Sequence, residues 1–382
     1  MERDISPPPT KRRRISNGSD VKVAKSKSKE TDQPNPDTSQ SLRIFTWNIN
    51  GIIPFLQTPI TKFFSPSTSS TTTASKAPAS LRTFLHRHHF PQLLFLQEVK
   101  IPASDLKTQR AVTAAVDDRL DADDEEHGPE YVVHFTLPRD KFNAKGFGGR
   151  VYGVASIIRK DFYDQHVTSV RDVEWDLEGR VSVVELKGKL AIWNIYAVNG
   201  TDAPYRDPQT GQAKGTRHDR KLAFHRLLVD ECKKMEGDGW THVLAGDFNV
   251  APARIDGHPN LRTWPAQHVV NRADFNSRFL DGRNGVGLRA VDVWRALKKD
   301  ERKYTYYPRG REWGSSCDRV DLILASRKLW EDGDVLDAGI LDSPQERGPS
   351  DHVPLWVRVR YECEKEIQDR DREENEGKRT ES

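Results

Sequence analysis

The chain has 382 residues, of which 35% are hydrophobic and 31% are charged, and its formal net charge is only +3 at pH 7. So small an excess of positive charge does not by itself predict a polyanionic partner, and any attraction to phosphate must come from local patches. Three widely separated cysteines exclude a disulfide framework or a zinc-binding spacing and favour a reducing compartment. No apolar run approaches the roughly 20 residues that cross a bilayer, and the first residues hold no apolar signal-peptide core. We therefore expect a soluble intracellular protein with no membrane partner.

Both ends of the chain have the composition of disordered segments. Residues 1–40 are rich in Pro, Ser, Lys and Asp with almost no large apolar side chains, and residues 362–382 are highly charged. Within the first segment, the compact basic cluster Lys11-Arg12-Arg13-Arg14 predicts a nuclear import signal, with an import receptor as partner and the nucleus as location. A solvated basic tail or a non-specific DNA tether is the alternative interpretation.

Between these tails, residues 41–361 carry the hydrophobic periodicity of one folded domain. Apolar alternation or continuous apolar runs predict strands at 42–47, 93–96, 131–136, 151–158, 181–186, 190–197, 242–245, 320–324 and 353–359. Apolar residues at helical spacing predict helices at 81–89, 105–120 and 217–235. The Ser/Thr-rich stretch 65–80 predicts a flexible insertion. This pattern favours an α/β fold in which two sheets pack together and helices cover the outside.

Polar side chains follow several of the predicted strands at the point where each strand ends. Asn48 and Asn50 follow the first strand, Glu98 follows the strand at 93–96, and Asp247 and Asn249 follow the strand at 242–245. Each of them taken alone also fits a turn, a helix cap or a core ion pair. Buried carboxylates are costly unless they are paired or bind a metal, and so many at neighbouring strand ends favour one common site.

Three further polar residues belong to the same pattern. Asp321 interrupts the apolar strand at 320–324, and Asp351 and His352 directly precede the strand at 353–359. Carboxylate and amide oxygens are the ligands that Mg²⁺ and Mn²⁺ prefer, and a histidine beside them can protonate or orient a phosphate oxygen. Together these groups predict metal-dependent hydrolysis of a phosphodiester.

With these residues in place, the sequence resembles the endonuclease/exonuclease/phosphatase superfamily, and within it the exonuclease III class of apurinic/apyrimidinic (AP) endonucleases. The matching motifs occur in the family's order and are Thr46-Trp47-Asn48-Ile49-Asn50-Gly51, Leu96-Gln97-Glu98-Val99-Lys100, Asn194-Ile195-Tyr196-Ala197-Val198-Asn199-Gly200, Gly246-Asp247-Phe248-Asn249-Val250, Arg319-Val320-Asp321 and Ser350-Asp351-His352-Val353-Pro354. The resemblance implies a DNase I-like, four-layered α/β sandwich, in which two mixed sheets are flanked by helices. It also implies a monomer that hydrolyses double-stranded DNA at abasic sites or damaged ends.

The resemblance implies a role for each matching residue. Glu98 is expected to be the main ligand of one Mg²⁺ (or Mn²⁺), with Asn50 and Asp351 near the same ion and Asn48 either beside the ion or orienting Asp247. A second ion, if present, would use Asp247, Asn249 and His352.

In the reaction itself, Asp247 is expected to position and deprotonate water, and Asn249 to hydrogen-bond the scissile phosphate. Asp321 would hold His352 against a phosphate oxygen, and Tyr196 would stabilise the phosphate or the leaving oxygen.

The substrate contacts are less fully specified. Asn199, Arg220 and Tyr306 are expected to touch the DNA, with Arg220 one of a basic group, Arg217, Arg220 and Lys221, that could bind phosphate. The sequence departs from the family at Val198, which often is proline, and at Asp318, where some relatives have an apolar pocket residue. Tyr306 and Tyr307 could supply the pocket's aromatic surface instead. A tyrosyl-DNA phosphodiesterase of the second type is the alternative function, although the Asn-x-Tyr-x-x-Asn pattern around Tyr196 favours an AP endonuclease.

Overall fold

Two six-stranded mixed sheets face each other in the computed structural model, which describes residues 41–56, 80–117, 128–144, 152–281 and 287–361. The first sheet has the order β15 (Val335–Ile340), β16 (Leu355–Arg360), β1 (Ser41–Asn48), β2 (Leu93–Gln97), β4 (Val154–Arg159) and β3 (Tyr131–Thr136). Only β1 and β2 run parallel, and the other neighbours are antiparallel.

The second sheet repeats this plan. Its order is β12 (Val291–Asp292), β14 (Asp321–Ala325), β10 (Thr241–Asp247), β7 (Leu190–Tyr196), β6 (Val181–Leu186) and β5 (Val167–Asp172). Here β10 and β7 form the one parallel pair at the centre. Each sheet therefore has two central strands whose carboxyl ends emerge side by side.

Alternation of side chains along the central strands builds three apolar layers. Ile44 and Phe95 point between the sheets and pack with Val243 of the second sheet. Their neighbours Phe45 and Leu94 point to the outer face of the first sheet. Strands that are buried on both faces are uniformly apolar, which explains why these strands were predicted from the sequence.

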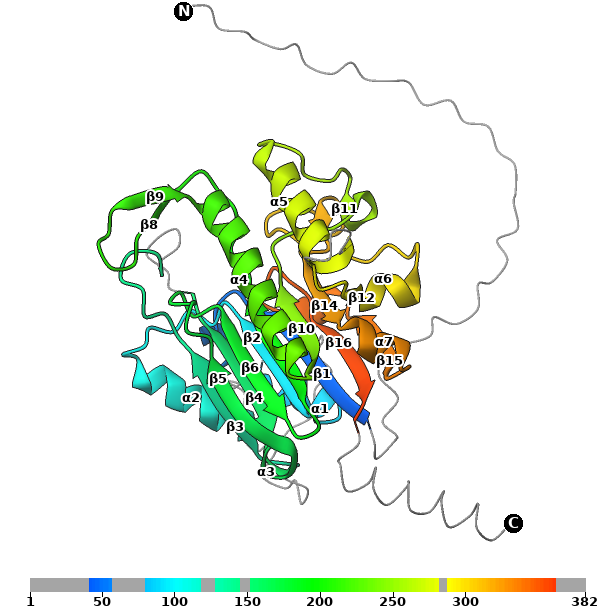
Figure 1. Ribbon diagram of the computed structural model, residues 1–382. Helices are drawn as coiled ribbons and strands as arrows, with labels where there is room; N and C mark the ends of the chain where they lie inside the picture. Colours follow the sequence, from blue (N-terminus) through cyan, green and yellow to red (C-terminus); the bar gives the residue numbers. More distant parts are fainter. Residues whose placement is uncertain (1–40, 57–79, 118–127, 145–151, 282–286, 362–382) are drawn as a thin grey trace, which may run out of the picture. The chain divides into compact units, whose positions relative to one another are not determined.

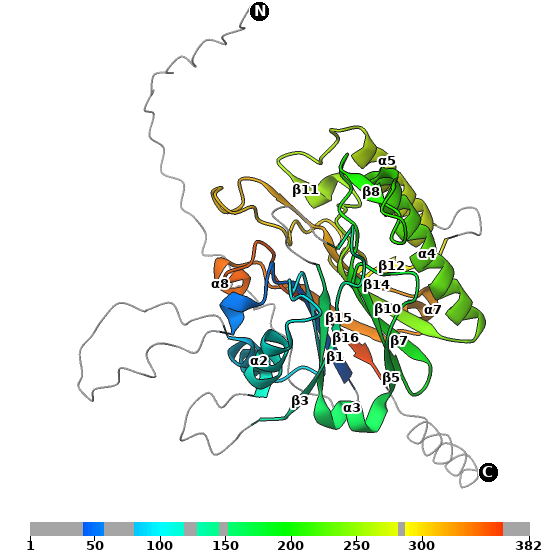
Figure 2. The same cartoon turned by 90° about the vertical axis from the view of Figure 1, so that its left-hand side faces the viewer.

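Helices cover the outer faces (Figures 1 and 2). The first sheet is covered by α1 (Leu81–Arg87) and α2 (Leu106–Asp117), and the second by α4 (Arg217–Gly237) and α5 (Gln267–Phe275). The four layers in Figure 2 confirm the predicted sandwich. None of the helices in the described ranges is long and apolar enough to cross a membrane.

Shorter elements complete the fold and were not predicted from the sequence. They are η1 (Ile53–Phe55), α3 (Lys160–His166), the hairpin β8 (Pro204–Arg206) and β9 (Ala213–Thr216), η4 (Arg254–Asp256), β11 (Gly257–His258) paired with β13 (Cys317–Asp318), η5 (Asn276–Asp281), α6 (Val293–Lys298), α7 (Arg327–Glu331) and α8 (Pro344–Arg347). The edge strands β5 and β15 were also missed. The predicted tails, and the insertion at 65–80 apart from Ser80, lie outside the described residues.

Gly246 lets the two parallel strands of the second sheet approach closely. Its φ is +147°, and a Cβ at this position would lie 1.9 Å from the carbonyl oxygen of Ile195 on β7. We expect Gly246→Ala to destabilise the fold by about 3 kcal/mol, because backbone atoms must move apart. Urea unfolding measures this, and Gly237→Ala, which has open space around its Cβ position, is the matched control. Equal stability of the two variants would contradict the close packing.

Candidate active site

The carboxyl ends of the four central strands bring the predicted polar residues together. Asn48 ends β1, Glu98 follows β2, Tyr196 ends β7 and Asp247 ends β10. The amide of Asn48 donates to Glu98 Oε1 at 3.1 Å and to Asp247 Oδ2 at 2.9 Å, which links the two sheets. The convergence expected from the sequence is therefore present.

Left-handed backbone conformations turn three of these residues into the site. Asn50, Glu98 and Asn249 have φ values of 51°, 52° and 52°. Asparagine adopts this conformation more readily than most residues, whereas a glutamate pays for it. Strained backbone concentrates at functional sites. Here the left-handed residues lie one or two positions after the end of a strand, and they change the direction of the chain there.

Asp247 lies at the centre of the site and is almost fully buried. Its carboxylate accepts from Asn48 Nδ2, from the backbone N–H of Asn249 at 2.8 Å and from Asn249 Nδ2 at 3.2 Å. Burial and the nearby charge of Asp321 raise the pKa of Asp247 to about 7, while His352 acts in the opposite direction. A carboxylate with a raised pKa is better able to accept a proton from water near neutral pH.

Asp321 and His352 form a buried pair beside Asp247. Asp321 begins β14 directly opposite Asp247 on β10, and its Oδ2 lies 2.7 Å from His352 Nδ1. Burial alone would lower the pKa of His352, but Asp321 and then Asp247 raise it to about 10. The contact with Asp321 therefore favours the charged imidazolium form of His352, which can donate a hydrogen bond from its other ring nitrogen.

Backbone contacts seat the loop that carries His352. The hydroxyl of Ser350 donates to the carbonyl oxygen of Asn48 at 2.6 Å, and it accepts from the N–H of His352 at 3.0 Å. The indole N–H of Trp47 donates to the carbonyl oxygen of His352 at 3.0 Å. These contacts join the first and last matching motifs, which are about 300 residues apart in sequence.

Glu98 is surrounded by donors. The Tyr196 hydroxyl donates to its Oε1 at 2.8 Å and Lys100 Nζ lies 2.8 Å from its Oε2. Burial would raise the pKa of Glu98, but Lys100 and the hydrogen bonds from Asn48 and Tyr196 together lower it. Glu98 is therefore held in its charged form.

The donor set around Glu98 fits a hard divalent cation. Lys100 donates both to Glu98 and to Asn50 Oδ1, and Asn50 Nδ2 donates to Asp351 Oδ1 at 2.8 Å. A positive charge thus stands between two of the predicted ligands, and carboxylate and amide oxygens suit Mg²⁺ or Mn²⁺.

Ligand atoms of Asp247, Asp321 and His352 also lie within 4.8 Å of one another. The contact between Asp321 Oδ2 and His352 Nδ1 already uses one ligand atom of each residue. The group of ligands around Glu98 is therefore the better cation site.

A buried ion cluster stands behind Tyr196. Arg180 places its guanidinium 4.7 Å from the centre of the Tyr196 ring and 4.1 Å from that of Tyr152. Glu178 accepts from Arg180 at 2.9 Å, from Arg217 at 2.6 Å and from Arg220 at 3.0 Å. Sequence reasoning missed Glu178 and Arg180, although two opposite charges directly before the apolar strand β6 were a usable signal.

Arg220, which was predicted to contact the DNA, belongs to this ion cluster. The side chains of Arg217 and Arg220 are nearly buried and turned to Glu178 rather than free at the surface. The basic group at the start of α4 is therefore mainly part of the support for Tyr196, because the hydrogen bonds of its arginines already end on a carboxylate.

The remaining predicted substrate residues are Asn199, three positions after Tyr196, and Tyr306. Asn199 is exposed, and the half-buried Tyr306 lies with its ring centre 5.0 Å from that of His352. Tyr307 instead is buried, donates to Asp342 and stacks on Trp313 at 3.7 Å. Of the two tyrosines considered for the pocket, Tyr306 alone lies against His352. The half-buried Asp318 is backbone-paired with Tyr306 and adds a carboxylate next to it.

Lys221 fastens two loops of the site together. Its buried ammonium donates to the carbonyl oxygens of Val198 at 2.9 Å, Phe248 at 3.0 Å and Asn249 at 3.1 Å. Burial lowers the pKa of Lys221 to about 7, with Asp247 opposing the shift. Three acceptors match the three N–H groups of the protonated amine, so the geometry favours the charged form.

We expect Lys221→Met to lower kcat by about 10- to 100-fold with little change in KM, because misplacing the loop of Asn249 costs orientation rather than binding. Steady-state kinetics test this, and Lys234→Met, an exposed position on the same helix, is the control. A loss confined to KM would assign Lys221 to substrate binding instead.

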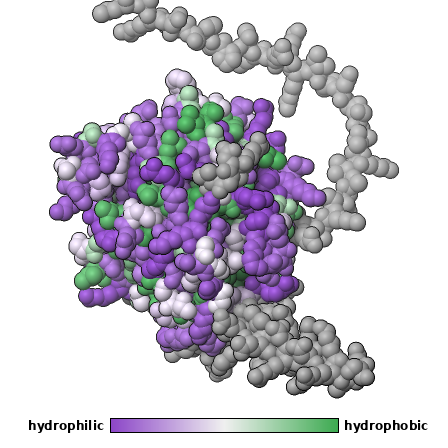
Figure 3. Space-filling model, viewed as in Figure 1, coloured by the Kyte–Doolittle hydropathy of each residue, from purple (hydrophilic) through white to green (hydrophobic). Residues whose placement is uncertain are grey.

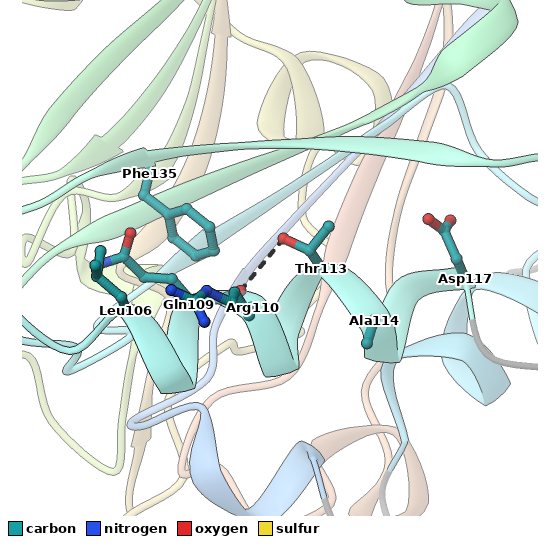
Figure 4. Close-up of a pocket in the computed structure, with 7 residues that line it drawn as sticks. All are labelled: Leu106, Gln109, Arg110, Thr113, Ala114, Asp117 and Phe135. Atoms are coloured by element: carbon teal, nitrogen blue, oxygen red, sulfur yellow. Dashed lines mark hydrogen bonds between the residues drawn. The ribbon is translucent and has the colours of Figure 1, made fainter.

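A cavity of about 490 Å³ lies away from these residues, between α2 and β3. Figure 4 shows the Phe135 ring over the face of α2 that carries Gln109 and Thr113, whose hydroxyl donates to the Gln109 carbonyl at 3.2 Å. Its lining residues are Leu106, Gln109, Arg110, Thr113, Ala114, Asp117 and Phe135. It contains none of the predicted site residues, so the chemistry is assigned to the strand ends.

Comparison with known proteins agrees with this geometry. Residues 45–352 match the model of the Endonuclease/Exonuclease/phosphatase family. No curated protein gave a significant match.

Three solved structures have a similar fold. An AP endonuclease from Archaeoglobus fulgidus is 22% identical with a TM-score of 0.52, and the alignment covers 83% of this chain and 98% of that one. The catalytic domain of Xenopus laevis APE2 is 18% identical with a TM-score of 0.54, covering 85% and 94%. The AP endonuclease LMAP from Leishmania major is 16% identical with a TM-score of 0.55, covering 85% and 90%.

The identities of these structures are low, so they show a shared fold, whereas the family match extends across every strand-end motif from Asn48 to His352. The chain therefore belongs to the Endonuclease/Exonuclease/phosphatase family and is a phosphodiester hydrolase.

Proposed function

We propose that this hydrolase is an AP endonuclease, which cuts double-stranded DNA 5′ to an abasic site and also trims blocked 3′ ends. The observation that carries the proposal is the contact of Asn48 with both Glu98 and Asp247, with the Asp321–His352 pair alongside. In-line hydrolysis of a phosphodiester requires a group that accepts a proton, a cation and a carboxylate centre, all within hydrogen-bond reach of one another. The AP endonucleases among the similar structures support DNA as the substrate.

The residues divide the chemistry by position. Asp247 orients a water molecule and takes its proton, because its carboxylate is held by Asn48 and Asn249 and has a raised pKa. His352 donates to a phosphate oxygen as negative charge develops, and Asp321 fixes the ring that does so. The phosphorus–oxygen bond to the leaving 3′ oxygen breaks as the bond to water forms, and Tyr196, next to Glu98, is proposed to stabilise the phosphate.

Glu98, Asn50 and Asp351 would hold a divalent cation, with Mg²⁺ as our proposal and Mn²⁺ as a substitute. When bound, it supplies positive charge that offsets the negative charge of the phosphate in the transition state. Lys100 must then give up its contact with Glu98 or Asn50.

The Tyr196 hydroxyl bears on the alternative, a tyrosyl-DNA phosphodiesterase of the second type. A tyrosine donating to Glu98 at 2.8 Å stands where that family usually has a histidine, and this favours the AP endonuclease. The test is to incubate the protein and Mg²⁺ with a duplex carrying one abasic-site analogue and, separately, with a duplex carrying a 5′-phosphotyrosine. We expect incision of the first, abolished by EDTA and restored by Mg²⁺. Removal of the tyrosine without incision would transfer the protein to the alternative.

We further propose that the protein acts in the nucleus as a monomer. The basic cluster Lys11–Arg14 supports this location, and it lies outside the described residues. A fluorescent fusion of the full chain is expected in the nucleus, and replacing the four basic residues with alanine is expected to leave it cytoplasmic. Nuclear accumulation of the replaced form would refute an import signal at this cluster.

A further inference from the structure

Trp264 is the most exposed large hydrophobic side chain of the described residues. Its side chain is 81% exposed, and Val269 and Val270 on α5 are 44% and 48% exposed. Trp264 lies in the segment 259–266 between β11 and α5, and a hydrophobic patch lies over α5 in Figure 3. Water contact is unfavourable for so large an apolar surface, which makes this segment a candidate for binding.

Backbone pairing ties the start of this segment to the active site. His352 pairs with Tyr306, Tyr306 with Asp318, and Asp318 with Gly257 of β11. Neighbouring strands lie about 4.8 Å apart, so three steps place Gly257, two residues before the segment, roughly 15 Å from His352. This is the span of about four base pairs along duplex DNA.

Arg272 holds the segment in place. Its Nη2 donates to the carbonyl oxygen of Arg262 at 2.6 Å, and its Nε donates to the carbonyl oxygen of Ala251 at 2.8 Å. Ala251 follows Asp247 and Asn249 in sequence. Through Arg272, the segment of Trp264 is therefore attached to the loop that follows β10. A rigid aromatic side chain loses little entropy on binding.

The charge next to Trp264 suits a nucleic acid. Arg262 is exposed, and it is close enough to Tyr306 and Asp318 for its charge to oppose the effect of burial on both. Phosphate contacts from arginine position DNA without reading its sequence. A protein partner that covered Trp264 would have to bind next to the positive charge of Arg262, beside a site that cleaves phosphodiesters.

We infer that Trp264 and Arg262 form a DNA contact beside the active site, in which the indole stacks on an unpaired base several base pairs from the scissile phosphate. Stacking requires a free base face, which a paired base inside a duplex does not offer. The inference rests on the proposed function, since it takes DNA as the substrate, and it adds a preference for DNA whose bases are unpaired several base pairs from the cleaved bond.

The test compares two fluorescent duplexes, each with one abasic analogue, that differ only in whether the bases about four to six positions from it are paired or mismatched. Binding is measured by anisotropy in an Asp247→Asn background, which slows turnover in Mg²⁺ by at least about 10²-fold. We expect Trp264→Ala to raise the Kd for the mismatched duplex by about 5- to 100-fold and for the paired duplex by less than about twofold. Trp264→Phe should restore most of the affinity, and Leu106→Ala, 55% exposed on α2, should change neither Kd.

Hydrolysis of bis(p-nitrophenyl) phosphate by Trp264→Ala, with Asp247 intact, reports separately on the catalytic groups and should equal that of the unmodified protein. An equal loss of affinity for both duplexes would overturn stacking on an unpaired base. Unchanged affinity for both would overturn the DNA contact and leave the patch to a protein partner. If the unmodified protein hydrolyses the small ester but binds neither duplex, the proposed DNA substrate fails as well.

Discussion

Replacing Asp247 with asparagine is expected to lower kcat by about 10²- to 10⁴-fold, the contribution of a positioned general base. Asparagine has nearly the same shape, but it cannot take a proton from water. The hydrogen bond from the Asn249 backbone can be kept, because the remaining amide oxygen still accepts at the position of Oδ1. The new NH2 group, however, replaces the Oδ2 atom that accepts from the side chains of Asn48 and Asn249. The loss should therefore fall on the chemical step, through the missing proton acceptor and the altered contacts of Asn48 and Asn249.

The measurement is single-turnover cleavage of DNA, with anisotropy for affinity and thermal unfolding for the fold. Asp300→Asn, on an exposed turn, is the control and should retain full activity. A tenfold or smaller effect of Asp247→Asn on the cleavage rate, with the fold intact, would show that another group takes the proton.

Replacing Glu178 with glutamine is expected to destabilise the protein by about 3–5 kcal/mol, because it removes the negative charge that three buried or nearly buried arginines contact. Burial would raise the pKa of Glu178, but Arg180, Arg217 and Arg220 lower it to about 2. A carboxylate with a depressed pKa in the folded state contributes stability above its unfolded pKa, near 4.5. That contribution is lost as the pH falls from there toward 2.

Urea unfolding from pH 7 down to pH 3 should thus bring the unmodified protein and Glu178→Gln closer together in stability as the pH falls. Glu231→Gln is the matched control, because Glu231 pairs with Arg171 at the partly exposed end of α4, the helix that carries Arg217 and Arg220, and should cost no more than about 1 kcal/mol. A stability difference that does not change with pH would mean that the charge of Glu178 contributes little and that its shape is what matters.

The site residues could be predicted because each one interrupts an apolar run. Asn48, Glu98 and Asp247 stand where buried strands end. Because the central strands of each sheet are parallel, their carboxyl ends lie at the same edge of the sandwich. Asp321 and His352 could be predicted for the converse reason: they precede or begin strands that run antiparallel to β10 and β1, so they lie at the same edge.

The sequence could not predict which charges are used inside the protein. Arg217, Arg220 and Lys221 look like any basic first turn of a helix, yet their partners, Glu178 and three backbone carbonyls, come from segments 23 to 42 residues away. Only tertiary contacts decide whether a cation is solvated or buried. The same holds for Tyr306 and Tyr307, neighbours in sequence that face the catalytic histidine and Asp342 respectively.

Short edge elements were missed for a different reason. β5 is half-exposed and holds charged residues, and β11 and β13 are only two residues long. Hydrophobic periodicity needs several buried positions before it becomes visible. The segment that carries Trp264, residues 259–266, directly follows β11.

The proposed AP endonuclease activity is tested by mapping the cut made in a duplex with a single abasic-site analogue. We expect a single Mg²⁺-dependent incision at the phosphodiester 5′ to the lesion, which leaves a 3′-hydroxyl on one fragment and the abasic residue at the 5′ end of the other, and which Asp247→Asn slows by at least about 10²-fold. Cleavage on the other side of the lesion, or an intact duplex with folded protein and Mg²⁺ present, would refute the proposed activity.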